Sequence, residues 1–337
     1  MKAVGLFRYL PIAAPASLID LEIEKPKPKP RDILVEIKAI SVNPIDTKIR
    51  APKDEVEKEP KILGWDASGI VQEIGKDVTL FKIGDEVFYA GDINRQGSNA
   101  QFQIVDERIV GFKPKSLSFE EAAALPLTSI TAYESLFDRF KIDLNGADRG
   151  KSILIIGGAG GVSSIAIQLA KEAGLHVIAS ASREKTIEWI KKLGADEAVN
   201  HREKMKPQIK ALGREFVDYI AIFNDSDSHW NDVCEMIKPQ GHIVGIVANK
   251  EPLEMSQIRL KSITFSWEFM FTRAMYKTDD MIKQHELLNE IANLIDKKKI
   301  HTTLSTTMKP INAKNLKKAH ELLESGKTIG KIVICGF

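Results

Sequence analysis

The chain has 337 residues, a length that suggests two domains, and its 48 basic and 46 acidic residues leave a formal net charge of +2. So balanced a charge offers no strong field to nucleic acid or to an anionic membrane surface. Two cysteines, Cys234 and Cys335, are too few for a disulfide framework or a cysteine-rich zinc lobe. No apolar run approaches the ~20 residues of a membrane span, and the N-terminus lacks the apolar core of a signal peptide. We therefore expect a cytoplasmic protein with no membrane or nucleic-acid partner.

The first third of the chain is typical of β-structure. Alternating apolar and polar residues predict strands at Ile33–Ile40, Ser68–Ile74 and Asp85–Tyr89, with Gly and Pro between them. The run Lys25–Pro30 places a proline at every second position and is expected to be an exposed loop. Charges and prolines in Ala51–Lys61 predict a second surface loop.

The pattern changes near Ser118. Ser118 and Glu121 form a capping box at a helix start, and a second helix is expected from about Pro126 to Phe140. From Lys151 onward, apolar strands alternate with helical stretches. This alternation predicts a doubly wound parallel sheet with helices on both faces. The strands and helices expected are Ser152–Ile156, Val162–Ala173, His176–Ser180, Glu184–Leu193, Val217–Phe223, Trp230–Ile237 and His242–Val247.

The last part of the chain is expected to return to the first domain. We expect a helix at Asp279–Lys297, a strand at Thr302–Met308, a helix at Ala313–Glu324 and a final strand at Lys331–Cys335. The predicted architecture is therefore an α/β protein of two domains, residues 125–271 and residues 1–124 with 272–337.

A glycine-rich turn is the sharpest local motif. The apolar strand that ends at Ile156 runs into Gly157, and Gly160, Gly161 and Val162 open the following helix. Glycines let a backbone approach a pyrophosphate closely, and the helix N-terminus stabilises its charge. This context favours dinucleotide binding over a merely tight turn of small residues.

The end of the second strand bears on which dinucleotide binds. NAD sites usually carry an acidic residue about 20 residues after the turn, to hold the ribose 2′-hydroxyl. Here Ser180, Arg183 and Lys185 stand at that point and offer donors to a 2′-phosphate. We therefore favour NADPH, the alternative being an ordinary helix start capped by Ser182.

Taken together, these motifs resemble the medium-chain dehydrogenase/reductase superfamily, and within it the zinc-free quinone oxidoreductase branch, often labelled zinc-type alcohol dehydrogenase-like. The resemblance implies a Rossmann domain at 125–271 and a GroES-like catalytic domain in the remainder. It extends over essentially the whole chain and rests on the order of Ser41–Asp46, Gly64–Gly69, Ala122–Thr128, Gly157–Val162, Lys192–Asp196 and Gly330–Val333.

The resemblance also bears on metal and substrate. Zinc alcohol dehydrogenases place Cys, His and Cys where this chain has Asn43, Trp65 and Leu127, none of which suits a catalytic zinc. Without a metal to polarise a carbonyl, a quinone or conjugated enone is the expected acceptor, bound in the interdomain cleft. Asn43 is expected to hydrogen-bond the nicotinamide ribose or the substrate, or merely to begin a turn. Trp65 is expected to fill the vacated metal site.

Further roles follow from the same resemblance. An edge strand near Ile263–Ser266 is expected to pair with its copy in a homodimer. Additional cofactor contacts are implied for Thr128, His201, Phe223, Asn224, Ile246, Val247 and Lys331.

Two other functions stay open on sequence grounds. One is an NADPH-dependent enone or alkenal reductase, and the other is a non-catalytic, crystallin-like protein that binds NADPH and RNA. The near-neutral charge and the lack of an aromatic–basic motif argue against RNA.

Overall fold

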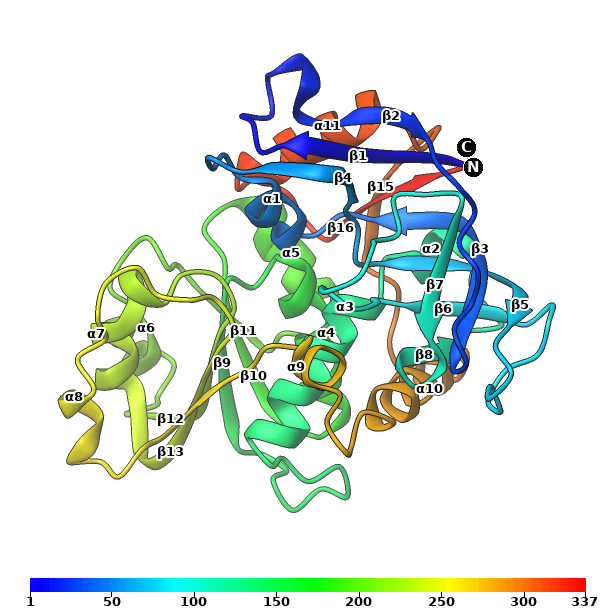
Figure 1. Ribbon diagram of the computed structural model, residues 1–337. Coiled ribbons are helices and arrows are strands. Elements are labelled where there is room, and N and C mark those ends of the chain that lie inside the picture. The colour runs from blue at the N-terminus through cyan, green and yellow to red at the C-terminus, as the bar shows by residue number, and fades with distance from the viewer. The chain divides into compact units, whose positions relative to one another are not determined.

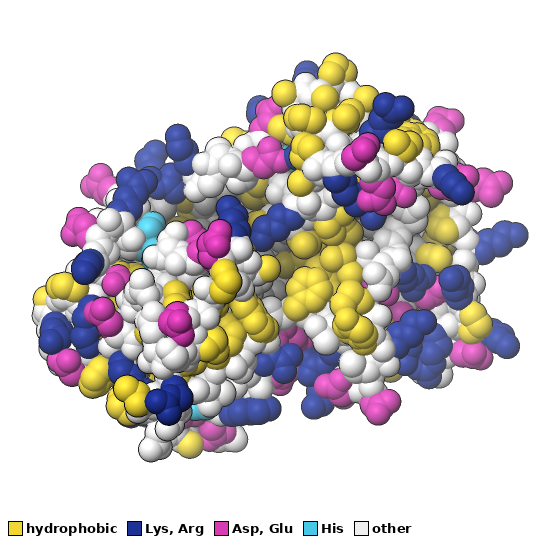
Figure 2. All heavy atoms as spheres, turned by 60° about the vertical axis from the view of Figure 1, so that its left-hand side comes forward, with side chains coloured by type: hydrophobic (Ala, Val, Ile, Leu, Met, Phe, Trp, Pro, Cys, Tyr) yellow, Lys and Arg dark blue, Asp and Glu magenta, His cyan; other side chains and the backbone are white.

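The structure is a computed structural model that describes residues 1–337, and the chain forms two compact units. Unit 1 consists of Met1–Ile130 and Phe271–Phe337, and unit 2 of Thr131–Met270. The first boundary falls inside helix α3 (Pro126–Tyr133), whereas the sequence boundary at 124/125 precedes that helix. No helix is long and apolar enough to cross a membrane. On the face drawn in Figure 2, basic and acidic side chains are interspersed.

Unit 1 is built on two sheets. In the smaller, β1 (Lys2–Arg8) lies between β2 (Ile19–Glu22) and β4 (Val56–Ile62). The larger has seven strands in the order β15-β16-β3-β5-β6-β8, with β7 paired to β3 (Figure 1). Their bounds are β3 Asp32–Ser41, β5 Ala67–Ile74, β6 Glu86–Tyr89, β7 Phe102–Asp106, β8 Val110–Phe112, β15 Leu304–Met308 and β16 Lys331–Cys335.

Antiparallel pairing of β16 with β3 joins the C-terminal tail to the first third of the chain. Val333 lies opposite Ser41, and the Val42 amide donates to the Ile332 carbonyl at 3.2 Å. The first residue of β16, Lys331, is thereby brought next to the segment that contains Asn43.

Strand β4 corrects the surface loop expected at Ala51–Lys61. It pairs antiparallel with β1, with Gly5 opposite Ile62 and Arg8 opposite Val56. Alternating charges and Pro60 concealed it, because charge and proline are what an edge strand tolerates. An edge strand of this kind lacks the apolar alternation that predicts a half-buried one.

Helices pack against the sheets of unit 1 and against one another. The expected capping box is present at α2 (Phe119–Ala123): the Ser118 amide donates to the Glu121 carboxylate at 2.9 Å, and the Glu121 amide donates to the Ser118 hydroxyl at 3.2 Å. Helix α10 packs on β8, and α1 packs on α11. The remaining bounds are α1 Pro44–Arg50, α9 Thr272–Tyr276, α10 Lys283–Asp296 and α11 Ala313–Glu324, with 3-10 turns at Pro15–Ser17 and Glu107–Ile109.

Unit 2 is the expected doubly wound fold. Its six parallel strands have the order β11-β10-β9-β12-β13-β14, so the direction of winding reverses between β9 and β12. Helix α4 lies against one face of the sheet and α6 and α7 against the other (Figure 1). The strands are β9 Ser152–Ile156, β10 His176–Ser180, β11 Glu197–Val199, β12 Val217–Ile222, β13 Ile237–Gly245 and β14 Thr264–Trp267. The helices are α4 Gly161–Glu172, α5 Glu184–Lys192, α6 Met205–Ala211, α7 Ser226–Met236 and α8 Ser256–Arg259.

Local features of unit 2 differ from the sequence prediction. Strand β11 and helices α6 and α8 lie where no element was expected; β11 has only three residues and α8 four, too few for a periodicity to be read. The helix expected over Pro126–Phe140 is α-helical to Tyr133 and a π-helix over Glu134–Arg139.

Candidate functional site

The glycine turn (Gly157–Gly161) follows β9 directly. Gly157 has φ +88°, a conformation that side chains other than glycine rarely adopt, and its amide donates to the Ser180 hydroxyl at 2.9 Å. A Cβ on Gly158 would lie 2.7 Å from the Ser180 carbonyl oxygen. The turn therefore needs glycine at both positions to pass over the end of β10.

Beyond the turn, the N-terminus of α4 is open. Gly160 is its N-cap and no side chain caps it; the first helical bond joins the Ser164 amide to the Gly160 carbonyl at 2.9 Å. The amides of Gly161, Val162 and Ser163 belong to the first turn, where no intrahelical acceptor exists. A Cβ on Gly160 would meet only the Gly157 oxygen, at 3.3 Å. These features fit a pyrophosphate group, which needs free amides and close backbone approach.

Two serines that the sequence associates with the turn are committed to it. Ser163, in the first turn of α4, donates to the Gly157 carbonyl at 2.8 Å. Ser180 is 1% exposed and accepts from the Gly157 amide. Its oxygen thus supports the turn, which differs from the phosphate contact expected from sequence.

Arg183 and Lys185 lie exposed at the N-terminus of α5. The N-cap is Arg183 and not Ser182, because the Arg183 amide donates to Thr186 Oγ1 at 3.1 Å and the Thr186 amide returns to the Arg183 carbonyl at 2.9 Å. Both cations therefore stand beyond the carboxyl end of β10.

The other expected cofactor residues of unit 2 follow the ends of parallel strands. His201 comes after β11, and its pKa is lowered by burial and by the nearby His229 ring, whose centroid is 6.2 Å away. A Cβ built on Gly157 would lie 3.1 Å from the Asn224 side chain, so Asn224 borders the turn. Ligands of doubly wound folds bind at this edge, where the winding reverses. Phe223 and Asn224 follow β12, and Ile246 and Val247 follow β13.

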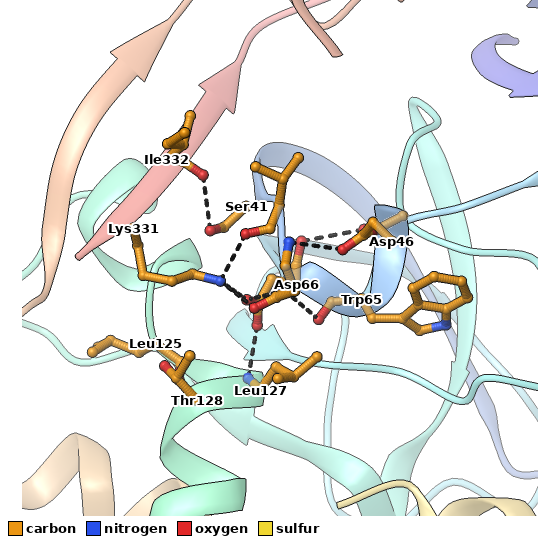
Figure 3. Close-up of polar contacts among 12 residues, drawn as sticks. Ser41, Asp46, Trp65, Asp66, Leu125, Leu127, Thr128, Lys331 and Ile332 are labelled. Carbon is orange, nitrogen blue, oxygen red and sulfur yellow. Dashed lines mark hydrogen bonds and ion pairs between the residues drawn. The ribbon is translucent and has the colours of Figure 1, made fainter. Parts of the chain in front are cut away.

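Unit 1 holds a buried group of charged and amide side chains, here called the ammonium network: Asn43, Asp46, Asp66 and Lys331 (Figure 3). The Lys331 ammonium donates to the Val42 carbonyl at 3.1 Å, to Asp66 Oδ2 at 2.9 Å and to Asn43 Oδ1. An ammonium has three hydrogens, so each of them has an acceptor. Lys331 is 3% exposed, and no donor is left for the cofactor contact expected from sequence.

Asp66 is the acceptor at the centre of the network. Its Oδ2 also accepts from Asn43 Nδ2 at 2.8 Å, and its Oδ1 accepts from the Leu127 amide at 2.7 Å. Burial raises the pKa of Asp66, while Lys331 and the two amide donors oppose the rise. The carboxylate thus connects the start of α3 with the segments that contain Asn43 and Lys331.

Asn43 and Asp46 link the network to α1. The Asn43 amide donates to Asp46 Oδ2 at 2.7 Å, which forms half of a capping box. Asn43 Nδ2 also lies 3.4 Å from the Trp65 carbonyl. Asp46 is fully buried, its Oδ1 has no hydrogen-bond partner, and burial raises its pKa to about 7.

Trp65 and Thr128 are buried beside this network. The Trp65 ring packs edge-on against Phe271, with centroids 6.2 Å apart, and its indole N–H lies 3.4 Å from the Asp92 carbonyl. Thr128 is 2% exposed, and its hydroxyl donates to the Leu125 carbonyl at 3.0 Å. Thr128 therefore stabilises the first turn of α3, where the sequence reading expected a cofactor contact.

The structure brings Asn43, Trp65, Leu127 and Lys331 together in unit 1, but Asp46 and Asp66 were missed as functional candidates. Asp46 had a sequence signature, because Asn followed three residues later by Asp is a capping-box pattern. Asp66 lies in a small, apolar stretch, where a charge is unusual. No group of three His, Cys, Asp or Glu side chains is arranged to hold a metal ion.

Comparison with known proteins places these two units in a family. The model of the alcohol dehydrogenase GroES-like domain matches residues 29–131, and that of the zinc-binding dehydrogenase matches residues 161–284. A zinc-type alcohol dehydrogenase-like protein of Staphylococcus aureus is 51% identical over 335 residues, covering 99% of each chain. The 2-methylene-furan-3-one reductase of Solanum lycopersicum is 31% identical over 327 residues, covering 94% of this chain and 74% of its own.

Solved structures agree with the fold. A protein of Rhizobium etli, provisionally named a zinc-dependent alcohol dehydrogenase, has a TM-score of 0.95 at 47% identity, covering 100% of this chain and 98% of its own. The quinone oxidoreductase of Coxiella burnetii has a TM-score of 0.83 at 27% identity, covering 100% and 99%. This chain therefore belongs to the medium-chain dehydrogenase/reductase superfamily of pyridine-nucleotide-dependent oxidoreductases.

Proposed function

We propose that this oxidoreductase is an NADPH-dependent quinone reductase that transfers hydride to a quinone or conjugated carbonyl without a catalytic zinc. One observation carries the proposal. At the three positions where zinc alcohol dehydrogenases hold their metal, this chain has Asn43, Trp65 and Leu127, and Asn43 is held in the ammonium network by Lys331 and Asp66.

Zinc does not fit the residues present. A catalytic zinc takes three ligands from Cys, His and carboxylates, and the ligand positions hold an amide, an indole and an aliphatic side chain. The network holds two carboxylates, Asp46 and Asp66, but no third His, Cys, Asp or Glu side chain joins them to hold a metal ion. The Lys331 ammonium beside Asp66 would also repel a divalent cation.

A dinucleotide, in contrast, fits the glycine turn. Bound NADPH supplies a hydride from C4 of its nicotinamide. The uncapped amides of α4 would hold the pyrophosphate, and the bare Gly160 would let it approach. Arg183 and Lys185 would bind the 2′-phosphate. The end of β10, from Ser180 to Ser182, holds no carboxylate to favour a free 2′-hydroxyl, which supports NADPH over NADH, and the first acidic residue is Glu184 in the first turn of α5.

The absence of suitable zinc ligands limits the acceptor. An unactivated ketone needs a Lewis acid or a positioned proton donor to stabilise the alkoxide as hydride arrives. A quinone or enone instead spreads that charge through its conjugated system. A second candidate, reduction of a conjugated enone such as an alkenal, is favoured by the 31% identity to the tomato 2-methylene-furan-3-one reductase.

A homodimer in the cytoplasm is part of the same proposal. Strand β14 is the edge of the six-stranded sheet, and Trp267 at its end is 45% exposed. An edge strand carries backbone N–H and C=O groups without a neighbouring strand, and these groups can pair with β14 of a second copy related by a twofold axis.

The test is a substrate panel with the purified protein. Quinones, enones and unactivated ketones are assayed with NADPH and with NADH by loss of nicotinamide absorbance. We expect turnover of quinones or enones with NADPH and none of ketones. Deuterium at C4 of NADPH should appear in the enone product. Ketone reduction at a rate comparable to that of a quinone would contradict the proposal.

A further inference from the structure

The three oxygens around Lys331 Nζ form a cation site. They are the Val42 carbonyl, Asn43 Oδ1 and Asp66 Oδ2, and one of them carries a full negative charge when ionised. Carbonyl, amide and carboxylate oxygens are the ligands that hard cations take in proteins. Here the cation is the ammonium of the Lys331 side chain, which belongs to β16.

This cation and its carboxylate connect segments distant in sequence. Lys331 belongs to β16, Asn43 lies 288 positions before it at the start of α1, and the Leu127 amide at the start of α3 binds the far oxygen of Asp66. Figure 3 shows Lys331 and Leu127 approaching Asp66 from separate elements. A structural metal ion connects chain segments through its ligands in the same manner.

We propose that the Lys331 ammonium is a tethered cation that does the work of a metal ion at the centre of unit 1, positioning Asn43 and α1. The proposal rests on the proposed function in so far as that function has no zinc. Lys331 and Asp66 are positioning residues in this proposal and not catalytic ones.

The saturation of the network supports a positioning role. Both hydrogens of Asn43 Nδ2 have acceptors, at 2.8 Å and 3.4 Å, and its Oδ1 accepts from Lys331. The amide orientation is thereby fixed, because exchanging its nitrogen and oxygen would set like groups against Asp66 and Lys331. Without the ammonium, the buried Asp66 carboxylate would lose its charge partner.

The experiment is chemical rescue. Lys331→Ala removes the ammonium and its tether and leaves space beside the three oxygens, whereas Lys331→Met removes the charge but fills that space. Thermal unfolding of both variants and of the full-length wild type is measured in ethylammonium chloride and in choline chloride at equal ionic strength. Choline is a cation without N–H donors and controls for general salt effects.

We expect ethylammonium to raise the unfolding temperature of Lys331→Ala by several degrees over choline, and to leave Lys331→Met and the wild type unchanged. Addition of Asp66→Asn to Lys331→Ala should abolish the rescue, because the charge that binds the cation is gone. If Lys331→Ala does not fold alone, the yield of refolding in ethylammonium against choline is the readout. Equal responses of the Ala and Met variants, or no rescue of either yield or unfolding temperature, would overturn the proposal.

Turnover and cofactor affinity separate positioning from other roles. With the quinone found active in the panel, Lys331→Ala should lose about 100-fold in kcat, the cost of a misplacement of ~1 Å, and ethylammonium should restore part of it. A variant that loses only NADPH affinity, at an unchanged unfolding temperature, would return Lys331 to the cofactor role implied by sequence and overturn the proposal. The unfolding measurements need neither NADPH nor quinone, so an inactive wild type would refute the proposed function alone.

Discussion

Replacement of Asp46 by asparagine tests whether the buried network is electrically neutral. Asp46 is fully buried with one unpartnered oxygen, and burial raises its pKa from 3.8 to about 7. The folded state therefore holds a proton that the unfolded state releases above about pH 4. Because the folded pKa is the higher one, wild-type stability falls as pH rises through this window and levels off above pH 7.

The magnitude follows from the size of the shift. Each pKa unit corresponds to ~1.4 kcal/mol, so the full effect of a rise from 3.8 to about 7 is ~4 kcal/mol. Between pH 5 and pH 8 the free energy of unfolding of the wild type should fall by about 2–3 kcal/mol through this group. Asp46→Asn keeps an oxygen that can accept from the Asn43 amide but cannot ionise, so the unfolding free energy of the variant should not fall with pH through this group.

Urea unfolding of the wild type and Asp46→Asn at pH 5, 6, 7 and 8 measures the difference. Titrating groups outside the ammonium network are common to the two proteins, so their contributions to the difference in unfolding free energy cancel. We expect the variant to gain on the wild type by about 2–3 kcal/mol over this range, with the gain ending near pH 7. A difference in unfolding free energy that stays constant with pH would refute a neutral, buried Asp46.

Three further predictions concern cofactor and metal. Gly160→Val should abolish NADPH binding, measured by fluorescence titration, because the side chain blocks the approach of the pyrophosphate. Its unfolding should stay cooperative, because a Cβ there meets only one atom, at 3.3 Å. Gly158→Ala should instead destabilise the protein, because its Cβ would lie 2.7 Å from a carbonyl oxygen. Lys185→Ala should weaken NADPH binding by about tenfold or more and barely change NADH binding. Lys192→Ala, at the other end of α5, is the control. Equal affinity of the wild type for both cofactors would contradict the proposed 2′-phosphate site. Metal analysis should find less than one zinc per chain, and EDTA should leave activity unchanged, whereas one tightly held zinc lost together with activity would overturn the zinc-independent mechanism.

The parts of the fold predicted best from sequence are those whose bounds depend on local pattern. The buried strands β9, β10 and β16 and helix α11 have the expected bounds, because apolar runs or a helical period mark them along their whole length. Strand β4 was missed because its charges and Pro60 mark an edge, and only its partner β1 makes it a strand.

The candidate site divides in the same way. The glycine turn was readable because strand, glycines and helix are consecutive in the chain. The ammonium network could not be predicted from sequence, because it forms only when β16 pairs with β3 and places Lys331 beside residues almost 300 positions earlier. A motif comparison could assign Lys331 to the cofactor, but it could not count the acceptors that surround its ammonium.

The ammonium network and a zinc site of the alcohol dehydrogenase kind can both be electrically neutral. A divalent zinc with two thiolates and a neutral histidine is a buried group with no net charge. Lys331 and Asp66 also cancel, provided that Asp46 keeps its proton. Asn43, Trp65 and Leu127 are uncharged and so leave this balance between Lys331 and Asp66 undisturbed.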